Sequence, residues 1–423
     1  MSKINIAWEK IFTELEVINT INNNGYLYLT ADKIKEIGKY EPRLMTKFDS
    51  SESRPSILKE NHISIFSVTN GTYILFKDEL KKTYYSFPEY KESPLIHTSK
   101  IDLNTFDTFP SGVFTTESQT IDFAYISDIL STFTGKKDLY LTLRGRTRSG
   151  KFSFKLPSND HIVNVEGVQI ELDAGFESND SIYILEAKIG KRDNFHIRQL
   201  YYPYLEWSKR SKKKIVPIFF TYSNGLFYLS EIIFNDVFGD LEIKRTSCYI
   251  LNESPKAKIN LKKMLEVFKI ESEGEPFPQA NDLDKIIDLA NNIEHGVNTK
   301  NKISDFFDFD ERQGDYYANA LLYLDFIKKE GKNFILTELG KHFTKQQSRN
   351  ERTRVLFGQL LKKPSFRELI KLLVERNFNL SSLSKNEIAF IIEKNTSLGG
   401  TTPMRRASTV NNWLQWLLKN SEL

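Results

Sequence analysis

Residues 168–188 read VQIELDAGFESNDSIYILEAK, two strand-like runs with a polar break between them. In the first run apolar and polar residues alternate up to Asp173, which predicts a strand with one buried face. A glycine and an Asn-Asp pair in the break favour a turn. The second run is apolar until Glu186 and Lys188, which share a face at its end. A hairpin of this kind predicts that Asp173, Glu186 and Lys188 lie close together.

These residue types suit the hydrolysis of a phosphodiester bond. Carboxylates such as Asp173 and Glu186 bind Mg²⁺, which prefers oxygen ligands, and the carbonyl of Ala187 is a natural further ligand. The metal ion polarises the phosphate and lowers the pKa of a bound water, while Lys188 stabilises the negative charge that develops. The alternative is a solvated strand end with a surface ion pair, which contributes less than about 1 kcal/mol.

The Glu-x-Lys triplet alone carries no weight, because it also begins at Glu79, Glu89 and Glu242. The copy at Glu186 differs from these in its setting. It ends an apolar strand, an aspartate precedes it on another strand, and a predicted helix follows it. This setting favours the catalytic interpretation.

Asp173, twelve intervening residues and then Glu186-Ala187-Lys188 resemble the PD-(D/E)xK motif, which many type II restriction endonucleases carry. Residues 171–177, ELDAGFE, are also similar to a group of bacterial restriction enzymes with winged-helix segments. The resemblance implies a restriction-endonuclease-like mixed β-sheet core flanked by helices. It also implies that Asp173 and Glu186 bind one or two Mg²⁺ ions and that Lys188 is the catalytic lysine. The sequence departs from the motif at Leu172, where the family pattern has proline.

Glu171 and two residues of a predicted helix at 196–209 are further candidates. Glu171 lies on the same predicted strand face as Asp173, either as an additional ligand or as the ion-pair partner of a basic neighbour. Gln199 resembles the glutamine that orients the lysine or a water in this superfamily. Arg198 is a candidate phosphate contact, although ordinary packing of an amphipathic helix is the alternative for this segment.

Basic side chains gather around a predicted turn at 144–150, between predicted strands at 139–143 and 151–156. Such side chains neutralise phosphates and supply affinity without reading sequence, whereas a solvated turn is the alternative. The residues concerned are Arg144, Arg146, Arg148 and Lys151.

The chain is predicted to be an α/β multidomain protein. Residues 1–120 form an N-terminal α+β DNA-recognition domain with a hairpin at Asn70-Gly71, and 121–270 form the nuclease core, a mixed sheet with a crossover helix. Residues 271–281 form a linker. Arg43 and Lys47 are candidate DNA contacts, because the segment around them resembles one that recurs in the same group of restriction enzymes.

Residues 282–423 show helical periodicity and resemble winged-helix modules. Helices are predicted at 282–292 and 299–307, a recognition helix at 311–329 and a wing at 332–337. A second such unit spans 364–418, and the alternative for either unit is an interaction or dimer module. The predicted DNA contacts of the second unit are Thr401, Thr402, Arg405, Arg406 and Asn411.

Composition excludes several classes of protein. The 423 residues include 59 basic and 55 acidic ones, so any nucleic-acid surface must arise from local clustering. One cysteine excludes an internal disulfide framework and a Cys-rich zinc module. The sequence contains no run of about 18 apolar residues, so no membrane span is predicted. The first residues lack the pattern of a signal peptide. The expected compartment is therefore the cytoplasm.

These patterns predict a Mg²⁺-dependent type II restriction endonuclease that cuts double-stranded DNA at a short specific sequence. One catalytic site per chain and two scissile bonds favour a homodimer, and the resemblance implies a cognate DNA methyltransferase. The alternatives are a winged-helix DNA-binding regulator without activity and a nuclease of repair or recombination.

Overall fold

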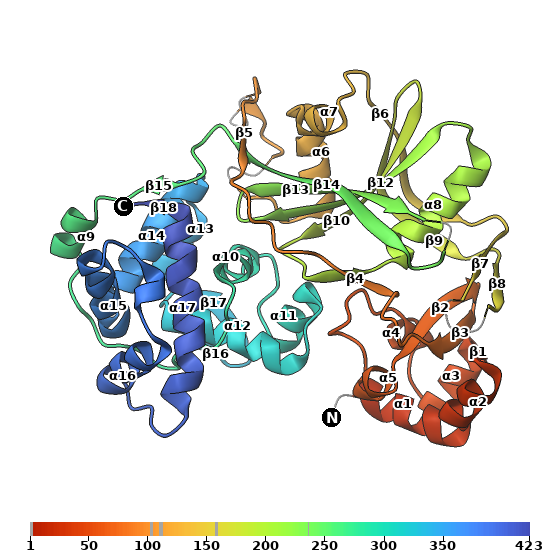
Figure 1. Ribbon diagram of the computed structural model, residues 1–423, viewed down its shortest axis with the longest axis horizontal. Coiled ribbons are helices and arrows are strands. Elements are labelled where there is room, and N and C mark those ends of the chain that lie inside the picture. The colour runs from red at the N-terminus through yellow and green to blue at the C-terminus, as the bar shows by residue number, and fades with distance from the viewer. Residues whose placement is uncertain (1–2, 102–104, 110–112, 157–159, 236) are drawn as a thin grey trace.

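The computed structural model describes residues 3–101, 105–109, 113–156, 160–235 and 237–423. It is a mixed α/β protein with one large mixed sheet and many helices. Figure 1 shows an N-terminal unit of helices and three strands below this sheet and a mainly helical C-terminal part beside it. Within the described residues, no helix is long and apolar enough to cross a membrane.

The N-terminal unit packs helices against a three-stranded antiparallel sheet of order β1-β3-β2. The hairpin predicted at Asn70-Gly71 is confirmed, since it joins β2 to β3. The first helical run is broken in two at Glu16, whose φ of 44° is left-handed. The elements are α1 (Lys3–Glu14), α2 (Val17–Asn24), β1 (Tyr26–Thr30), α3 (Ala31–Gly38), α4 (Pro42–Thr46), α5 (Ser56–Glu60), β2 (Ile63–Thr69) and β3 (Thr72–Lys77).

The large sheet has seven strands in the order β5-β14-β13-β12-β10-β9-β6. The pairs β10–β12 and β14–β5 are parallel and the other neighbours are antiparallel. Helix α8 (Arg198–Arg210) connects β10 to β12, so the predicted mixed sheet with a crossover helix is confirmed. The strands are β5 (Leu95–His97), β6 (Tyr140–Arg148), β9 (Gln169–Glu177), β10 (Ser181–Ile189), β12 (Lys214–Ser223), β13 (Leu226–Phe234) and β14 (Leu241–Leu251).

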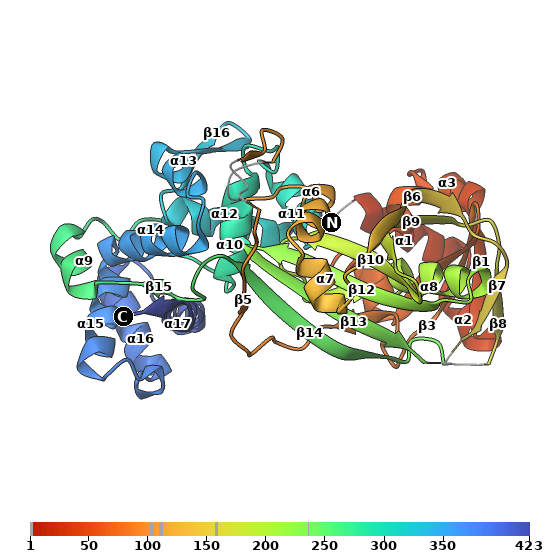
Figure 2. The ribbon, with the colours of Figure 1, turned by 90° about the horizontal axis from the view of Figure 1, so that it is seen from above.

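The two faces of this sheet are covered differently. On one face α6 (Glu117–Ile126) and α7 (Ile129–Thr134) bury a core that includes Phe123 and Phe176, and Figure 2 shows these helices in front of the strands. On the other face α8 and strands β2 and β3 of the N-terminal unit share one core, in which Phe66 and Ile184 lie. The N-terminal unit is therefore joined to the sheet by a common hydrophobic core.

Smaller strand pairs complete this half of the molecule: β7 (Phe152–Lys155) with β8 (Ile162–Val165), and β4 (Tyr84–Ser86) with β11 (Asn194–His196). The predicted turn at 144–150 is wrong over most of its length, because Arg144 to Arg148 belong to β6. Gly145 has a φ of +94°, at a register shift between β6 and β9. A glycine-based irregularity thus lets the strand continue where the sequence indicated a turn.

The C-terminal part contains one hydrophobic core built from its own helices. The predicted recognition helix 311–329 is too long, since α12 ends at Tyr323 and Asp325 is left-handed with a φ of 58°. A hairpin of two strands follows it, and the segment predicted as a wing, 332–337, covers the second strand. The elements are β15 (Ala257–Lys258), α9 (Leu261–Val267), α10 (Leu283–Asn292), α11 (Lys300–Phe307), α12 (Glu311–Tyr323), β16 (Ile327–Glu330), β17 (Asn333–Leu336), α13 (Glu338–Thr344), α14 (Arg349–Lys362), α15 (Pro364–Glu375), η2 (Leu380–Ser382), α16 (Lys385–Asn395), α17 (Thr402–Asn420) and β18 (Ser421–Glu422).

The segment predicted as a linker, 271–281, packs into this C-terminal core. Phe277 and Ala280 are buried there. The buried carboxylate of Glu273 accepts a hydrogen bond from the Tyr323 hydroxyl at 2.5 Å and another from the Ser365 backbone N–H at 2.7 Å. The segment 271–281, whose prolines and glutamates suggest a linker, therefore packs against the C-terminal core; it is here called the strap.

Candidate active site

A polar cleft of about 440 Å³ lies between the N-terminal unit and the sheet face that carries α8. Asp173 from β9, Glu186 and Lys188 from β10 and Gln199 from α8 all line it. The structure therefore brings the residues of the sequence motif to one wall of one cleft. The polar residues from the N-terminal unit that line it are Arg43, Thr46, Lys47, Asp49, Ser67, Thr69, Asn70 and Tyr73.

A bulge in β9 brings Asp173 beside Glu186. Its two neighbours face opposite sides of the sheet, since Leu172 packs in the core under α8 and Ala174 in the core under α6 and α7. In a regular strand these two residues would share a face. Leu143 of β6 pairs with Gly175 and Gly145 pairs with Leu172, so β9 contains one residue more than β6 between these two pairs. An extra residue of this kind defines a bulge. The simple alternation predicted for this strand is therefore wrong at Asp173.

Hydrogen bonds join the motif residues. Asp173 Oδ2 accepts from the Ala187 backbone N–H at 2.7 Å. Lys188 Nζ donates to Glu186 Oε1 at 2.5 Å and to the Ala187 carbonyl at 3.0 Å. Gln199 Nε2 donates to the same Glu186 Oε1 at 2.5 Å. One carboxylate oxygen thus receives both the ammonium and the amide group.

Burial and crowding of charge dominate the electrostatics of this wall. Burial, with Lys188 opposing it and Asp173 adding to it, raises the pKa of Glu186 to about 8. Burial acts to lower the pKa of Lys188, but Glu186, Glu117 and Asp173 outweigh it, so the pKa is raised and the ammonium stays charged. The wall is therefore a set of carboxylates gathered around a single buried cation.

The donor atoms fit a hard divalent cation. Glu186 Oε1 and the Ala187 carbonyl converge on the Lys188 ammonium, so both oxygens already face one positive charge. Such oxygens are the ligands that Mg²⁺ prefers, and Mg²⁺ keeps several waters. Among the described residues, no group of three or more His, Cys, Asp or Glu side chains is arranged to hold a metal ion. A metal ion here would depend on Asp173, Glu186, the Ala187 carbonyl and water.

Two acidic residues near Lys188 are absent from the sequence prediction. Glu117, in the first turn of α6, lies 3.7 Å from Lys188 Nζ, and burial raises the pKa of its carboxyl. Burial acts to raise the pKa of Asp49, but Lys47 and Lys188 outweigh it and hold that pKa below its ordinary value. Both residues come from segments distant in sequence. In its own segment Glu117 is an ordinary acidic residue at a helix start.

The predicted DNA contacts near the core divide into two groups. Arg43, Lys47, Arg146 and Arg198 line the cleft. Arg144 instead pairs with Asp122 at 2.5 Å, Lys151 pairs with Glu166 at 3.3 Å, and Arg148 is exposed on β6 outside the residues that line the cleft.

Glu171 lines the cleft, but its carboxylate pairs with Arg146 at 3.1 Å. The ion-pair interpretation of this residue therefore fits the geometry better than a role as metal ligand.

The predicted contacts of the C-terminal part lie elsewhere. Four of them lie in or next to the first turns of α17 and Asn411 lies in its middle, and the described lining of the cleft includes no residue from this helix. Thr401 and Arg405 are exposed and the other three are half-buried. The structure therefore does not bring them together with the residues of the cleft. The five residues are Thr401, Thr402, Arg405, Arg406 and Asn411.

Three family models match separate stretches of the chain, and each is described as a domain of unknown function. They are DUF6996 at residues 5–75, DUF6997 at 80–250 and DUF7226 at 285–422. No curated protein and no solved structure matches the chain. The second model includes the residues of the candidate active site in the core, and its description names no activity.

Proposed function

We propose that this protein is a Mg²⁺-dependent deoxyribonuclease that cuts double-stranded DNA at a short specific sequence, as type II restriction endonucleases do. The observation that carries the proposal is the convergence of Asp173, Glu186 and Lys188 on one cleft wall with cationic side chains around its mouth. The restriction-endonuclease-like core and a winged helix formed by α10–α12 with β16–β17 belong to the same proposal.

The residues have distinct roles in this proposal. Asp173, Glu186 and the Ala187 carbonyl hold Mg²⁺, which when bound supplies electrophilic activation of the phosphate. Lys188 would stabilise the negative charge that develops as a water oxygen bonds to phosphorus and the ester oxygen leaves. Gln199 keeps Glu186 oriented through its amide. Arg43, Lys47, Arg146 and Arg198 hold the phosphates of the strand in the cleft.

The test is cleavage of a long linear DNA in Mg²⁺ by the wild-type chain and by Lys188→Ala. The matched control is Lys91→Ala, which removes the lysine of another Glu-x-Lys triplet, the one that begins at Glu89, at an exposed position. Loss of a charge-stabilising group is expected to lower the rate by about 100-fold or more. Discrete fragments from the wild type and from Lys91→Ala, and none from Lys188→Ala, support the proposal.

Other outcomes separate the alternatives. Intact DNA with tight binding by all three proteins refutes catalysis and leaves a DNA-binding regulator. Preference for branched DNA points to repair or recombination. A homodimer, which two cuts and one site per chain favour, is tested by the mass of the protein on its cut DNA. If the role in restriction holds, methylation of the cut sequence by a partner DNA methyltransferase blocks cleavage.

A further inference from the structure

The catalytic end of β10 is held by a ladder on one side only. The register with β9 runs from Ile182 opposite Glu177 to Leu185 opposite Ala174, whereas the register with β12 continues to Ile189. From Glu186 onward, β12 and the hydrogen bond from Ala187 to the Asp173 side chain fix the strand. With no ladder to β9 there, the placement of Glu186 and Lys188 depends on these contacts and on the chain that follows directly after them.

That chain, residues 190–194, is here called the junction segment. Gly190 begins it with a φ of +83° and donates its N–H to the Tyr222 carbonyl at 2.8 Å. A β-carbon at Gly190 would lie 3.1 Å from the Phe307 ring of the C-terminal part. The junction segment thus leaves the sheet in a conformation suited to glycine and packs directly on α11.

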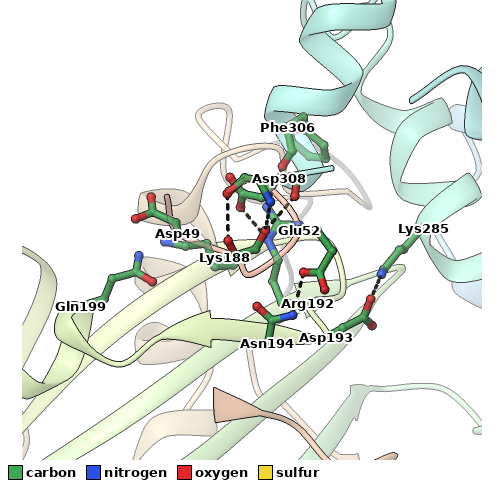
Figure 3. Close-up of polar contacts among 12 residues, drawn as sticks. Asp49, Glu52, Lys188, Arg192, Asp193, Asn194, Gln199, Lys285, Phe306 and Asp308 are labelled. Carbon is green, nitrogen blue, oxygen red and sulfur yellow. Dashed lines mark hydrogen bonds and ion pairs between the residues drawn. The ribbon is translucent and has the colours of Figure 1, made fainter. Parts of the chain in front are cut away.

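Charged contacts tie the junction segment to α10. Lys191 Nζ lies 2.9 Å from Asp282 Oδ2 at the start of this helix. Lys285 Nζ, whose side chain is only 5% exposed, lies 2.6 Å from Asp193 Oδ2 (Figure 3). A lysine this buried is costly without its partner. These two pairs fix both sides of the residue between them, Arg192.

Arg192 reaches the turn between α11 and α12. Its Nη2 donates to the Phe306 carbonyl at 2.7 Å, and its Nε lies 3.7 Å from Asp308 Oδ2 (Figure 3). The side chain is 8% exposed, and the guanidinium lies 5.9 Å from the centre of the Phe306 ring. Within the described residues, its Nε and Nη1 have no hydrogen-bond acceptor. A buried cation with only part of its bonding satisfied adds little stability, so the contact is better explained by the geometry that it imposes.

The N-terminal unit joins the same junction. Asn194 accepts from the Ser51 backbone N–H and donates to Glu52, each at 2.8 Å. The Ser50 hydroxyl donates to the Asp308 carbonyl at 2.8 Å. Ser50 follows Asp49, one of the carboxylates whose charge acts on Lys188. The three parts of the chain therefore meet at the end of the strand that carries the candidate catalytic residues.

We infer that Arg192 is a positioning residue, which ties the α11–α12 turn to the catalytic end of β10 and makes the cutting rate depend on the docked C-terminal part. This inference rests on the proposed nuclease function. Arg192 lines no part of the described cleft wall, so its removal leaves the groups that contact DNA in place. Loss of the contact frees the junction segment and with it Glu186 and Lys188, and a displacement of about 1 Å in a catalytic group lowers rates by about 100-fold.

The experiment compares full-length wild type, Arg192→Ala and Arg376→Ala. Arg376 is a matched control, because it also donates to a backbone carbonyl, that of Ser382 at 2.6 Å, and pairs with a carboxylate, that of Glu387 at 2.8 Å. The single-turnover cleavage rate is measured in Mg²⁺ on a fragment that the wild type cuts, and the dissociation constant on the same fragment without divalent metal. The expected result for Arg192→Ala is a rate 10- to 100-fold lower with a dissociation constant within about threefold of wild type.

Each outcome separates the two claims. If the wild type does not cut, the proposed function and this inference both fail. If the wild type cuts and Arg192→Ala cuts at the same rate, only the inference fails. If Arg192→Ala and Arg376→Ala lose rate equally and the losses follow the decrease in melting temperature, the inference fails and Arg192 has only a structural role. If Arg192→Ala does not fold, Arg192→Lys and Ser50→Ala replace it, because Lys keeps the charge without the forked donor geometry.

Discussion

Gly175 is the position at which the bulge in β9 is most sensitive to a single added carbon. It lies opposite Leu143 of β6 and Ile184 of β10. A β-carbon at Gly175 would lie 2.8 Å from Leu143 Cβ and 2.9 Å from Leu143 Cδ1. Favourable carbon–carbon contacts lie at about 3.5–4.0 Å, so Gly175→Ala forces β6 and β9 apart. Overpacking of this kind costs about 1–3 kcal/mol.

The assay is urea unfolding followed by tryptophan fluorescence, together with the cleavage rate in Mg²⁺. Gly175→Ala is expected to unfold at lower urea and to cut more slowly, since the bulge that places Asp173 lies beside it. Leu143→Gly removes the three carbons nearest to the added methyl group, so the double variant is more stable than the sum of the two single losses predicts. The coupling is expected to be about 1 kcal/mol or more. A Gly175→Ala protein with wild-type stability and wild-type cleavage refutes the reasoning.

Two further predictions concern charge. Burial raises the pKa of Asp288 to about 7 from its ordinary value of 3.8, so the folded chain keeps a proton that the unfolded chain releases between these values. The free energy of unfolding therefore falls as pH rises through this window, by up to about 1.4 kcal/mol per pH unit. When unfolding is measured across the window, Asp288→Asn should lose this dependence on pH. An unchanged dependence in the variant contradicts the burial argument. Arg146 and Glu171 form an ion pair whose side chains are 56% and 46% exposed, so Arg146→Ala changes stability by less than about 1 kcal/mol. Arg146→Ala should also weaken DNA binding and reduce the slope of log K against log salt concentration by about 0.9, whereas Glu171→Gln should strengthen binding. If a salt titration shows that Arg146→Ala binds more tightly than Glu171→Gln, Arg146 does not contact phosphate.

Local patterns were sufficient for the framework of the candidate site. Alternation, a polar break and an apolar run predict β9 and β10, and the amphipathic run after them predicts α8. Because Glu186 and Lys188 lie near the end of β10 and β9 contains Asp173, hairpin geometry predicts that the three residues lie close, although not the bulge that accompanies Asp173. The structure agrees on this convergence within one cleft.

Long-range packing determines what the patterns missed. Glu117 and Asp49 approach Lys188 from segments that nothing local connects to it. The bulge near Asp173 lies in the pairing of β9 with β6, whereas alternation describes a strand by itself. The strap at 271–281 reads as a linker, because a buried partner such as Tyr323 is invisible in its composition.

The hydrophobic core shared by the N-terminal unit and the sheet has a consequence for how this protein diverges. Phe66, Val68, Ile74 and Phe76 lie in one cluster with residues of β9, β10 and α8. Transfer of the first 80 residues as a cassette between relatives would separate two halves of this apolar interior and expose both. Under the proposed function, new sequence preferences would then arise by point changes at residues that line the cleft, for example Arg43 or Asn70, rather than by recombination of whole modules.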